Sequence, residues 1–267
     1  MDPTGKLLLL ASLLARDRVI SNNGKALLKD LTLRRDPRVL RLLNAFEEGG
    51  DQDFVRQVHK LLDRESHRVF KELFKECPLE RGKDLSKEER KALGLADDKS
   101  YIYGEVDFTN FAKVLRRLQL PAGGVFYDLG SGTGKAVMVA RLTQDFERCE
   151  GVEILEGLHR AATEVAEAFE ACVRRSLCSS QAQGLTMHLG SLIDFDWSDG
   201  DVVFANSTCF DDALMASIAA AAQRLRPGAL LITFTKGLES AAFEVLDRKR
   251  FEMSWGPATV FVHRRLT

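Results

Sequence analysis

The stretch that decides the fold is Val125-Phe126-Tyr127-Asp128-Leu129-Gly130-Ser131-Gly132-Thr133-Gly134-Lys135. Its first part, within residues 124–129, predicts a strand, because β-branched and aromatic side chains favour extended backbone. The alternating glycines that follow permit a tight turn that comes close to a ligand. A helix predicted from about 134 to 142 would point free N–H groups and its positive dipole end at that ligand. A ligand-binding turn between a strand and a helix is therefore expected.

The residues after this turn alternate between strand and helix patterns. Strands are predicted at 149–154, 185–189, 202–206 and 229–235. Helices are predicted at 158–177, 211–225 and 240–247. Such alternation implies a parallel sheet with helices on both faces. Two last strands, near 251–255 and 259–263 and joined through Gly256-Pro257, suit a closing antiparallel pair.

The N-terminal part reads as helix throughout. We expect an all-helical region at 1–97 and an α/β domain at 98–267, because the composition changes at Asp97-Asp98-Lys99-Ser100. The clearest amphipathic helix lies at 54–74. Pro37 divides the helical pattern of 25–46 into two, and Ser86-Lys87-Glu88-Glu89 matches a capping box, which predicts that a short helix starts there.

Composition places the chain among ordinary globular proteins. The net charge of −1 gives no global signature of nucleic-acid binding. The apolar run at 7–15 is too short to span a bilayer, and we favour a buried helix over a secretion signal. The five cysteines form no CxxC pair, which indicates a reduced intracellular protein without a structural zinc site. Cys149 and Cys209 are expected in core strands.

Polar residues follow the predicted parallel strands where a ligand would bind, at the carboxyl edge of the sheet. Glu153 ends the second strand 19 positions after Gly134, the separation expected for a carboxylate that accepts hydrogen bonds from ribose hydroxyls. Ser191, or alternatively Asp194, follows the third strand. Asn206 and Ser207 follow the fourth, where they could orient the reacting groups, or Ser207 could merely cap the next helix.

The spacing of the glycines distinguishes between ligands. Gly130-x-Gly132-x-Gly134 is one residue tighter than the GxGxxG fingerprint of dinucleotide-binding proteins. With Asp128 in front, it resembles motif I of the S-adenosylmethionine-dependent methyltransferases. The resemblance implies S-adenosyl-L-methionine as cofactor and argues against a nicotinamide-dependent dehydrogenase. Methyl transfer depends on holding the acceptor in line and desolvating it, so no cluster of general bases is required.

From about 101 to 263 the chain resembles the disruptor-of-telomeric-silencing class of histone lysine methyltransferases. The resemblance rests on Tyr103-Gly104-Glu105, on motif I, on Gly151-Val152-Glu153 and on Phe204-x-Asn206. It implies a seven-strand Rossmann-like methyltransferase sheet, mostly parallel, with an all-helical N-terminal extension. It also implies that the loop at 103–105 closes over the methionine end of the cofactor.

The same resemblance supplies the candidate site. The candidate catalytic residues are Asn206, Ser207 and Tyr103. The candidate cofactor-binding residues are Tyr103, Gly104, Glu105, Val106, Asp128, Gly130, Ser131, Gly132, Gly134, Lys135, Glu153, Ser191, Leu192 and Asn206. No metal ligand is predicted.

Three positions depart from the family pattern. Lys135 replaces a polar amide, and Ser191-Leu192 replaces an acidic-aromatic pair that usually holds adenine. Val260 or Phe261 stands where the family places a tyrosine in the lysine channel.

The leading hypothesis is a protein-lysine N-methyltransferase whose substrate is a protein, with a histone or nucleosome as the implied acceptor. The protein would then be nuclear, and cytoplasmic for another acceptor. Two alternatives stay open: a methyltransferase acting on a non-histone protein or small molecule, and a non-catalytic module that binds cofactor or partner. No membrane association is expected.

Overall fold

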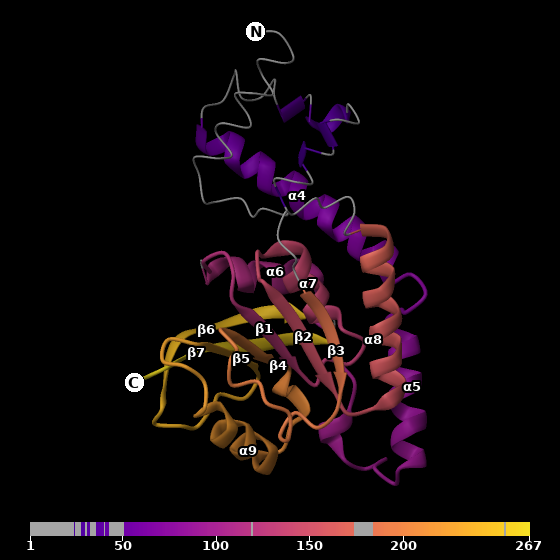
Figure 1. Ribbon diagram of the computed structural model, residues 1–267, viewed down its shortest axis with the longest axis vertical. Coiled ribbons are helices and arrows are strands. Elements are labelled where there is room, and N and C mark those ends of the chain that lie inside the picture. The colour runs from indigo at the N-terminus through magenta and orange to yellow at the C-terminus, as the bar shows by residue number, and fades with distance from the viewer. Residues whose placement is uncertain are drawn as a thin grey trace.

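The computed structural model of the chain describes residues 51–118, 120–173, 184–253 and 255–267, with residues 24, 28, 29, 31, 32, 36–39, 41 and 42 before them (Figure 1). The apolar run at 7–15 and much of the helical pattern at 25–46 lie outside the described residues.

A seven-stranded sheet forms the centre of the molecule. Its strands are β1 (Val125–Leu129), β2 (Arg148–Glu153), β3 (Gly184–Leu189), β4 (Val202–Ala205), β5 (Leu230–Phe234), β6 (Phe243–Met253) and β7 (Gly256–Arg265). They lie in the order β3-β2-β1-β4-β5-β7-β6. The first five are parallel, and β7 runs antiparallel to both of its neighbours. The predicted fold class is confirmed.

Helices cover both faces of the sheet. The helices of the α/β part are α6 (Phe108–Arg117), α7 (Lys135–Thr143), α8 (Glu156–Ala168) and α9 (Asp212–Ala222). Alternate residues of the strands face opposite sides, as a pleated backbone requires. Phe126 and Phe204 pack with α6 and α7, whereas Tyr127 and Val203 pack with α9. A π-helical segment, η2 (Phe169–Val173), continues α8.

Two N-terminal helices are attached to the sheet domain. The predicted amphipathic helix is α4 (Asp51–Leu73), and α5 (Leu79–Ala92) follows and runs beside α8 (Figure 1). Phe70 of α4 and Phe74, which directly follows that helix, belong to the same buried cluster as Phe111 and Phe126. The helical region and the sheet domain therefore share one hydrophobic core. The division of the chain at 97/98 stays a prediction.

The predicted capping box is wrong. α5 begins at Leu79, directly after Pro78, so Ser86 lies in the middle of the helix. Its hydroxyl donates a hydrogen bond to the carbonyl oxygen of Tyr101 at 3.1 Å. Ser86 and Glu89 therefore do not cap the start of α5, and their side chains bond to other elements of the fold.

The helix predicted at 240–247 is also wrong, because Phe243 begins the outer strand β6. Alanine and glutamate favour a helix locally, but the exposed edge of β7 offers backbone partners from Phe243 to Met253. Cys209 differs from its prediction as well. It lies half-buried in the 3₁₀ turn η3 (Ser207–Cys209), whereas Cys149 is buried in β2 as expected.

Strand β6 forms the outer border of the sheet. Arg248, Lys249 and Arg250 follow one another along it, and all three are exposed. Within the described ranges, no helix is long and apolar enough to cross a membrane.

Candidate functional site

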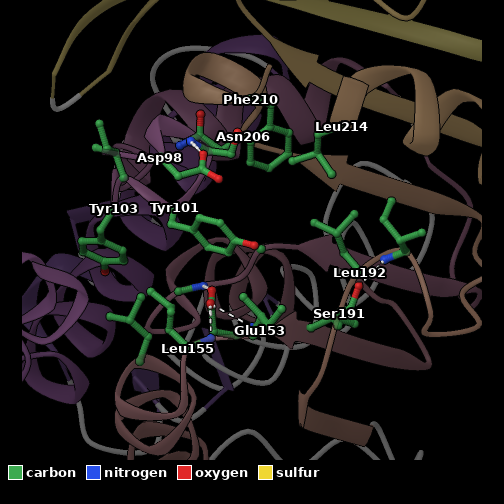
Figure 2. Close-up of a pocket in the computed structure, with 18 of the residues that line it drawn as sticks. Asp98, Tyr101, Tyr103, Glu153, Leu155, Ser191, Leu192, Asn206, Phe210 and Leu214 are labelled. Carbon is green, nitrogen blue, oxygen red and sulfur yellow. Dashed lines mark hydrogen bonds between the residues drawn. The ribbon is translucent and has the colours of Figure 1, made fainter. Parts of the chain in front are cut away.

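A cavity of about 350 Å³ opens at the carboxyl ends of the parallel strands (Figure 2). Its wall combines the segment before α6, the glycine turn after β1, the ends of β2, β3 and β4, and the start of α9. The chain leaves β1 toward β2 on one side, while β4 lies on the other, so the strand order reverses here. Ligands of open α/β sheets bind at such switch points.

The glycine turn forms one wall through its backbone. Gly130, Gly132 and Gly134 all have positive φ values, of 78°, 54° and 82°. Residues with a Cβ rarely adopt this conformation, so the turn requires glycine. Gly130 and Gly132 line the cavity. Gly134 lies at the N-terminus of α7, where an added Cβ would meet the side chain of Met187 at 2.8 Å.

Glu153 at the end of β2 is the central acceptor of the site. One carboxylate oxygen accepts the N–H of Gly132 at 2.7 Å, and the other accepts those of Ile154 at 2.9 Å and Leu155 at 2.8 Å. Burial raises the pKa of Glu153, and these three donors partly oppose that effect. A carboxylate has about four acceptor positions, so capacity remains for a ligand hydroxyl.

Asp128 and Ser131 lie behind the cavity wall. Asp128 is buried, and its pKa is raised well above its usual value by burial and then by the Glu153 carboxylate. The Ser131 hydroxyl is buried with no hydrogen-bond partner among the described residues, and it lies against Gly151. Both were expected to contact cofactor directly, but the structure places neither in the cavity wall.

The segment 98–106, here called the lid, carries a buried polar network. The hydroxyl of Tyr103 donates to Glu105 at 2.5 Å and shares a hydrogen bond with Thr133 at 2.6 Å. Lys135 donates to the second carboxylate oxygen of Glu105 at 2.5 Å. Burial and then Glu105 raise the pKa of Tyr103 well above its usual value. The hydroxyl, predicted to be catalytic, thus binds the lid to the glycine turn and α7. Val106 is buried in the core beside this network.

Asn206 joins the end of β4 to the lid. Its amide nitrogen donates to the carbonyl of Gly104 at 3.3 Å, and its oxygen accepts the hydroxyl of Thr208 at 3.0 Å. Trp255 lies beside them, because a Cβ on Gly104 would be 3.7 Å from its ring. Asn206 and Gly104 both line the cavity, so this cluster marks the end where the lid meets β4.

Ser207 has a different place from the one predicted. Its hydroxyl is fully buried and donates to the carbonyl oxygen of Phe234 at 2.7 Å. It does not line the cavity. The hydroxyl therefore connects the ends of β4 and β5.

Ser191 and Leu192 line the cavity after β3, as predicted, whereas Asp194 is exposed and lies outside its wall. Sequence reasoning missed several wall residues: Asp98, Tyr101, Leu155, Leu158, Phe210, Asp211 and Leu214. Figure 2 shows the ring of Tyr101 reaching into the cavity, with Tyr103 at its edge. The aromatic pattern around Gly104 was the available signal for Tyr101. In the described part of the chain, no cluster of three or more His, Cys, Asp or Glu side chains could hold a metal.

Strand β7, inserted antiparallel between β5 and β6, places this sheet in the class of seven-strand methyltransferase folds. Residues 95–253, more than half of the chain, match the family model for the histone methylation protein DOT1. The chain belongs to that family, and the resemblance seen in the sequence is confirmed.

Relatives agree with this assignment. The H3 lysine-79 specific histone-lysine N-methyltransferase of Eremothecium gossypii is 28% identical over 153 residues, which cover 55% of this chain and 26% of that protein. The chain therefore spans about a quarter of the length of this relative.

Solved structures to which the chain is similar include methyltransferases. An RNA methyltransferase from Salinibacter ruber in complex with S-adenosyl-L-homocysteine is 23% identical, with a TM-score of 0.40 over 54% of this chain and 81% of that one. TrmN from Thermus thermophilus is 18% identical, with a TM-score of 0.46 over 58% and 48%.

Proposed function

We propose that the protein is an S-adenosylmethionine-dependent protein-lysine N-methyltransferase. The observation that carries the proposal is the cavity at the switch point, where Glu153 offers a carboxylate beside the glycine turn within the family-matched residues. Bound S-adenosylmethionine would supply a methyl group activated by a positively charged sulfur. The chain's own residues must bind, orient and desolvate the reacting groups.

The residues present fit this cofactor. Glu153 retains acceptor capacity for a ribose hydroxyl, and the backbone of Gly130 and Gly132 lines the cavity beside it. Leu192 and Leu214 offer apolar contacts to a base. The volume of about 350 Å³ falls in the usual range of small-molecule sites, about 300–1,000 Å³. The methionine end would then lie near Gly104.

The acceptor would approach at the cluster formed by Asn206, Gly104 and Trp255. Two hydrogen bonds fix the amide of Asn206, so it is a preorganised group at this end of the cavity. A lysine ammonium is attracted to the face of a tryptophan ring. Its nitrogen must lose a proton before its lone pair can accept a methyl group, and burial lowers the pKa of an amine. The Trp255 ring would thus attract the charged lysine, and desolvation of the amine at this end of the cavity would favour its neutral, reactive form.

A histone is the acceptor we propose, and the nucleus the place of action. Support comes from the family description and from the H3 lysine-79 specific relative. The cavity itself is consistent with any amine acceptor, so the acceptor is decided by experiment.

The test incubates the purified chain with labelled S-adenosylmethionine and either nucleosomes or a cell lysate. We expect label on histone, with methyl-lysine found by mass spectrometry. Asn206→Ala should abolish labelling, whereas Asn110→Ala removes an amide of the same kind from α6 and should retain it. Label confined to small molecules would refute a protein acceptor, and label on other lysate proteins alone would refute a histone.

A further inference from the structure

Three residues of α5 contact the two elements on either side of the cavity, which are the lid and the start of α8. Gly82, Ser86 and Glu89 are separated by four and three positions, so they lie on one face of the helix. They precede residues 95–253, which the family model matches. The helix is rich in charge, and Lys83, Lys87 and Glu88 are among its exposed positions.

Gly82 provides space for the lid. A Cβ at this position would lie 2.3 Å from the ring of Tyr103, closer than a Cβ lies to any non-bonded atom in folded proteins. On the opposite side, a Cβ on Gly132 would lie 2.4 Å from the same ring. The ring of Tyr103 is therefore held between two glycine backbones, one from α5 and one from the cofactor turn.

Ser86 holds the lid at Tyr101, two residues before Tyr103. Its buried hydroxyl donates to the carbonyl oxygen of Tyr101 at 3.1 Å. Tyr101 ends the 3₁₀ turn η1 (Lys99–Tyr101), and its ring reaches into the cavity (Figure 2). The hydroxyl thus restrains the backbone that carries this ring.

Glu89 holds the start of α8, on the side of the cavity opposite the lid. Its two carboxylate oxygens accept the N–H groups of Glu156 at 2.7 Å and Gly157 at 2.8 Å. These are the first residues of α8, whose own N-cap residue, Leu155, has no side chain that can cap. Unsatisfied N–H groups at a helix start need such an acceptor. Because Leu155 also donates to Glu153, Glu89 supports the wall that carries the ribose acceptor.

We propose that α5 is a positioning element of the cofactor site: Gly82 and Ser86 set the lid, and Glu89 sets the start of α8. This inference rests on one part of the proposed function, the binding of S-adenosylmethionine, and does not depend on the methylation of an acceptor. None of the residues of α5 lines the cavity. It fixes the distance between the two sides of the cavity, so changes on its inner face alter cofactor affinity.

The test measures binding of S-adenosyl-L-homocysteine to the full chain by calorimetry. Ser86→Ala removes one hydrogen bond and should weaken binding by about two- to ten-fold. Gly82→Ala displaces the Tyr103 ring and should weaken it by about ten-fold or more. The matched controls Glu88→Gln and Lys83→Ala change exposed residues of the same helix and should bind as the wild type does.

Two further measurements separate positioning from folding. Alanine favours a helix more than glycine does, so a role in helix stability alone predicts a more stable Gly82→Ala protein with unchanged affinity. In a Tyr103→Ala background the ring is absent, and Gly82→Ala should have no further effect on affinity. Amide hydrogen exchange at 100–104 should be faster in ligand-free Ser86→Ala than in Glu88→Gln.

The outcomes also distinguish this proposal from the proposed function. Wild-type binding without methylation of any acceptor would refute the enzyme and leave the positioning role standing. Unchanged affinity in both inner-face variants, or equal loss in the controls, would overturn the positioning role. A wild type that binds no analogue would overturn both.

Discussion

Replacing Tyr103 with phenylalanine separates a structural role of its hydroxyl from a catalytic one. The hydroxyl donates to Glu105 at 2.5 Å and shares a hydrogen bond with Thr133 at 2.6 Å. A hydrogen bond to a charged group contributes about 1.5–3 kcal/mol, and a neutral one about 0.5–1.5 kcal/mol. Because Glu105 and Thr133 are both buried, Tyr103→Phe should lower the free energy of unfolding by about 2–4 kcal/mol.

The assay compares urea unfolding with steady-state turnover. Tyr127→Phe is the matched control, because that hydroxyl donates a single hydrogen bond, at 2.9 Å, to the exposed residue Asp199. Because Asp199 is exposed and solvent screens its charge, we expect the control to lose only about 1 kcal/mol. At saturating cofactor and acceptor, both folded variants should keep turnover within about two-fold of the wild type, since neither hydroxyl meets the reacting groups.

A different pattern would refute this reasoning. If Tyr103→Phe unfolds at the same urea concentration as the Tyr127 variant but turns over about 100-fold more slowly, its hydroxyl takes part in the reaction.

Three other substitutions test the cavity. Glu153→Gln should weaken binding of S-adenosyl-L-homocysteine by about ten-fold in calorimetry, because the NH₂ group of the new glutamine would face backbone N–H donors. Glu150→Gln, on the same strand, should leave the affinity unchanged. The raised pKa of Asp128 means that its contribution to stability is fully present below its ordinary value of 3.8 and is lost as pH rises through the folded value. Asp128→Asn should therefore raise the unfolding midpoint of the ligand-free protein at neutral pH and flatten its pH dependence, and a lower midpoint there would contradict this. Lys135→Met leaves the buried Glu105 carboxylate without its ion pair and should cost about 3–5 kcal/mol in urea unfolding, and adding Glu105→Gln should recover much of it.

Local sequence patterns were sufficient for the five parallel strands and for the glycine turn, although not for the first part of β6. Strands β1, β4 and β5 are mostly apolar, and the turn after β1 contains glycine wherever φ is positive. Glu153 was found by its spacing, because the end of β2 must lie next to the end of β1 in this topology. These features depend on residues close in sequence or on a fixed order of strands.

Contacts between distant elements were not visible in the sequence. Tyr101 and Tyr103 are two positions apart, and in a regular strand they would share a face. The 3₁₀ turn ending at Tyr101 breaks that relation, so one ring reaches into the cavity and the other lies between two glycines. Ser86 and Glu89 were misread for a related reason. Their partners, Tyr101 and Glu156, come from other elements, and a capping pattern cannot reveal them.

The outer strand β6 has a consequence for how the protein behaves in solution. On its outer side, the part of the chain that the structure describes supplies no further strand, and such an edge is a template for pairing with a second molecule. If two β6 edges paired so that the runs Arg248-Lys249-Arg250 lay opposite each other, their positive charges would repel. Salt shortens the range of this repulsion from about 10 Å at 0.1 M to about 3 Å at 1 M. We therefore expect association through this edge to become stronger as ionic strength rises.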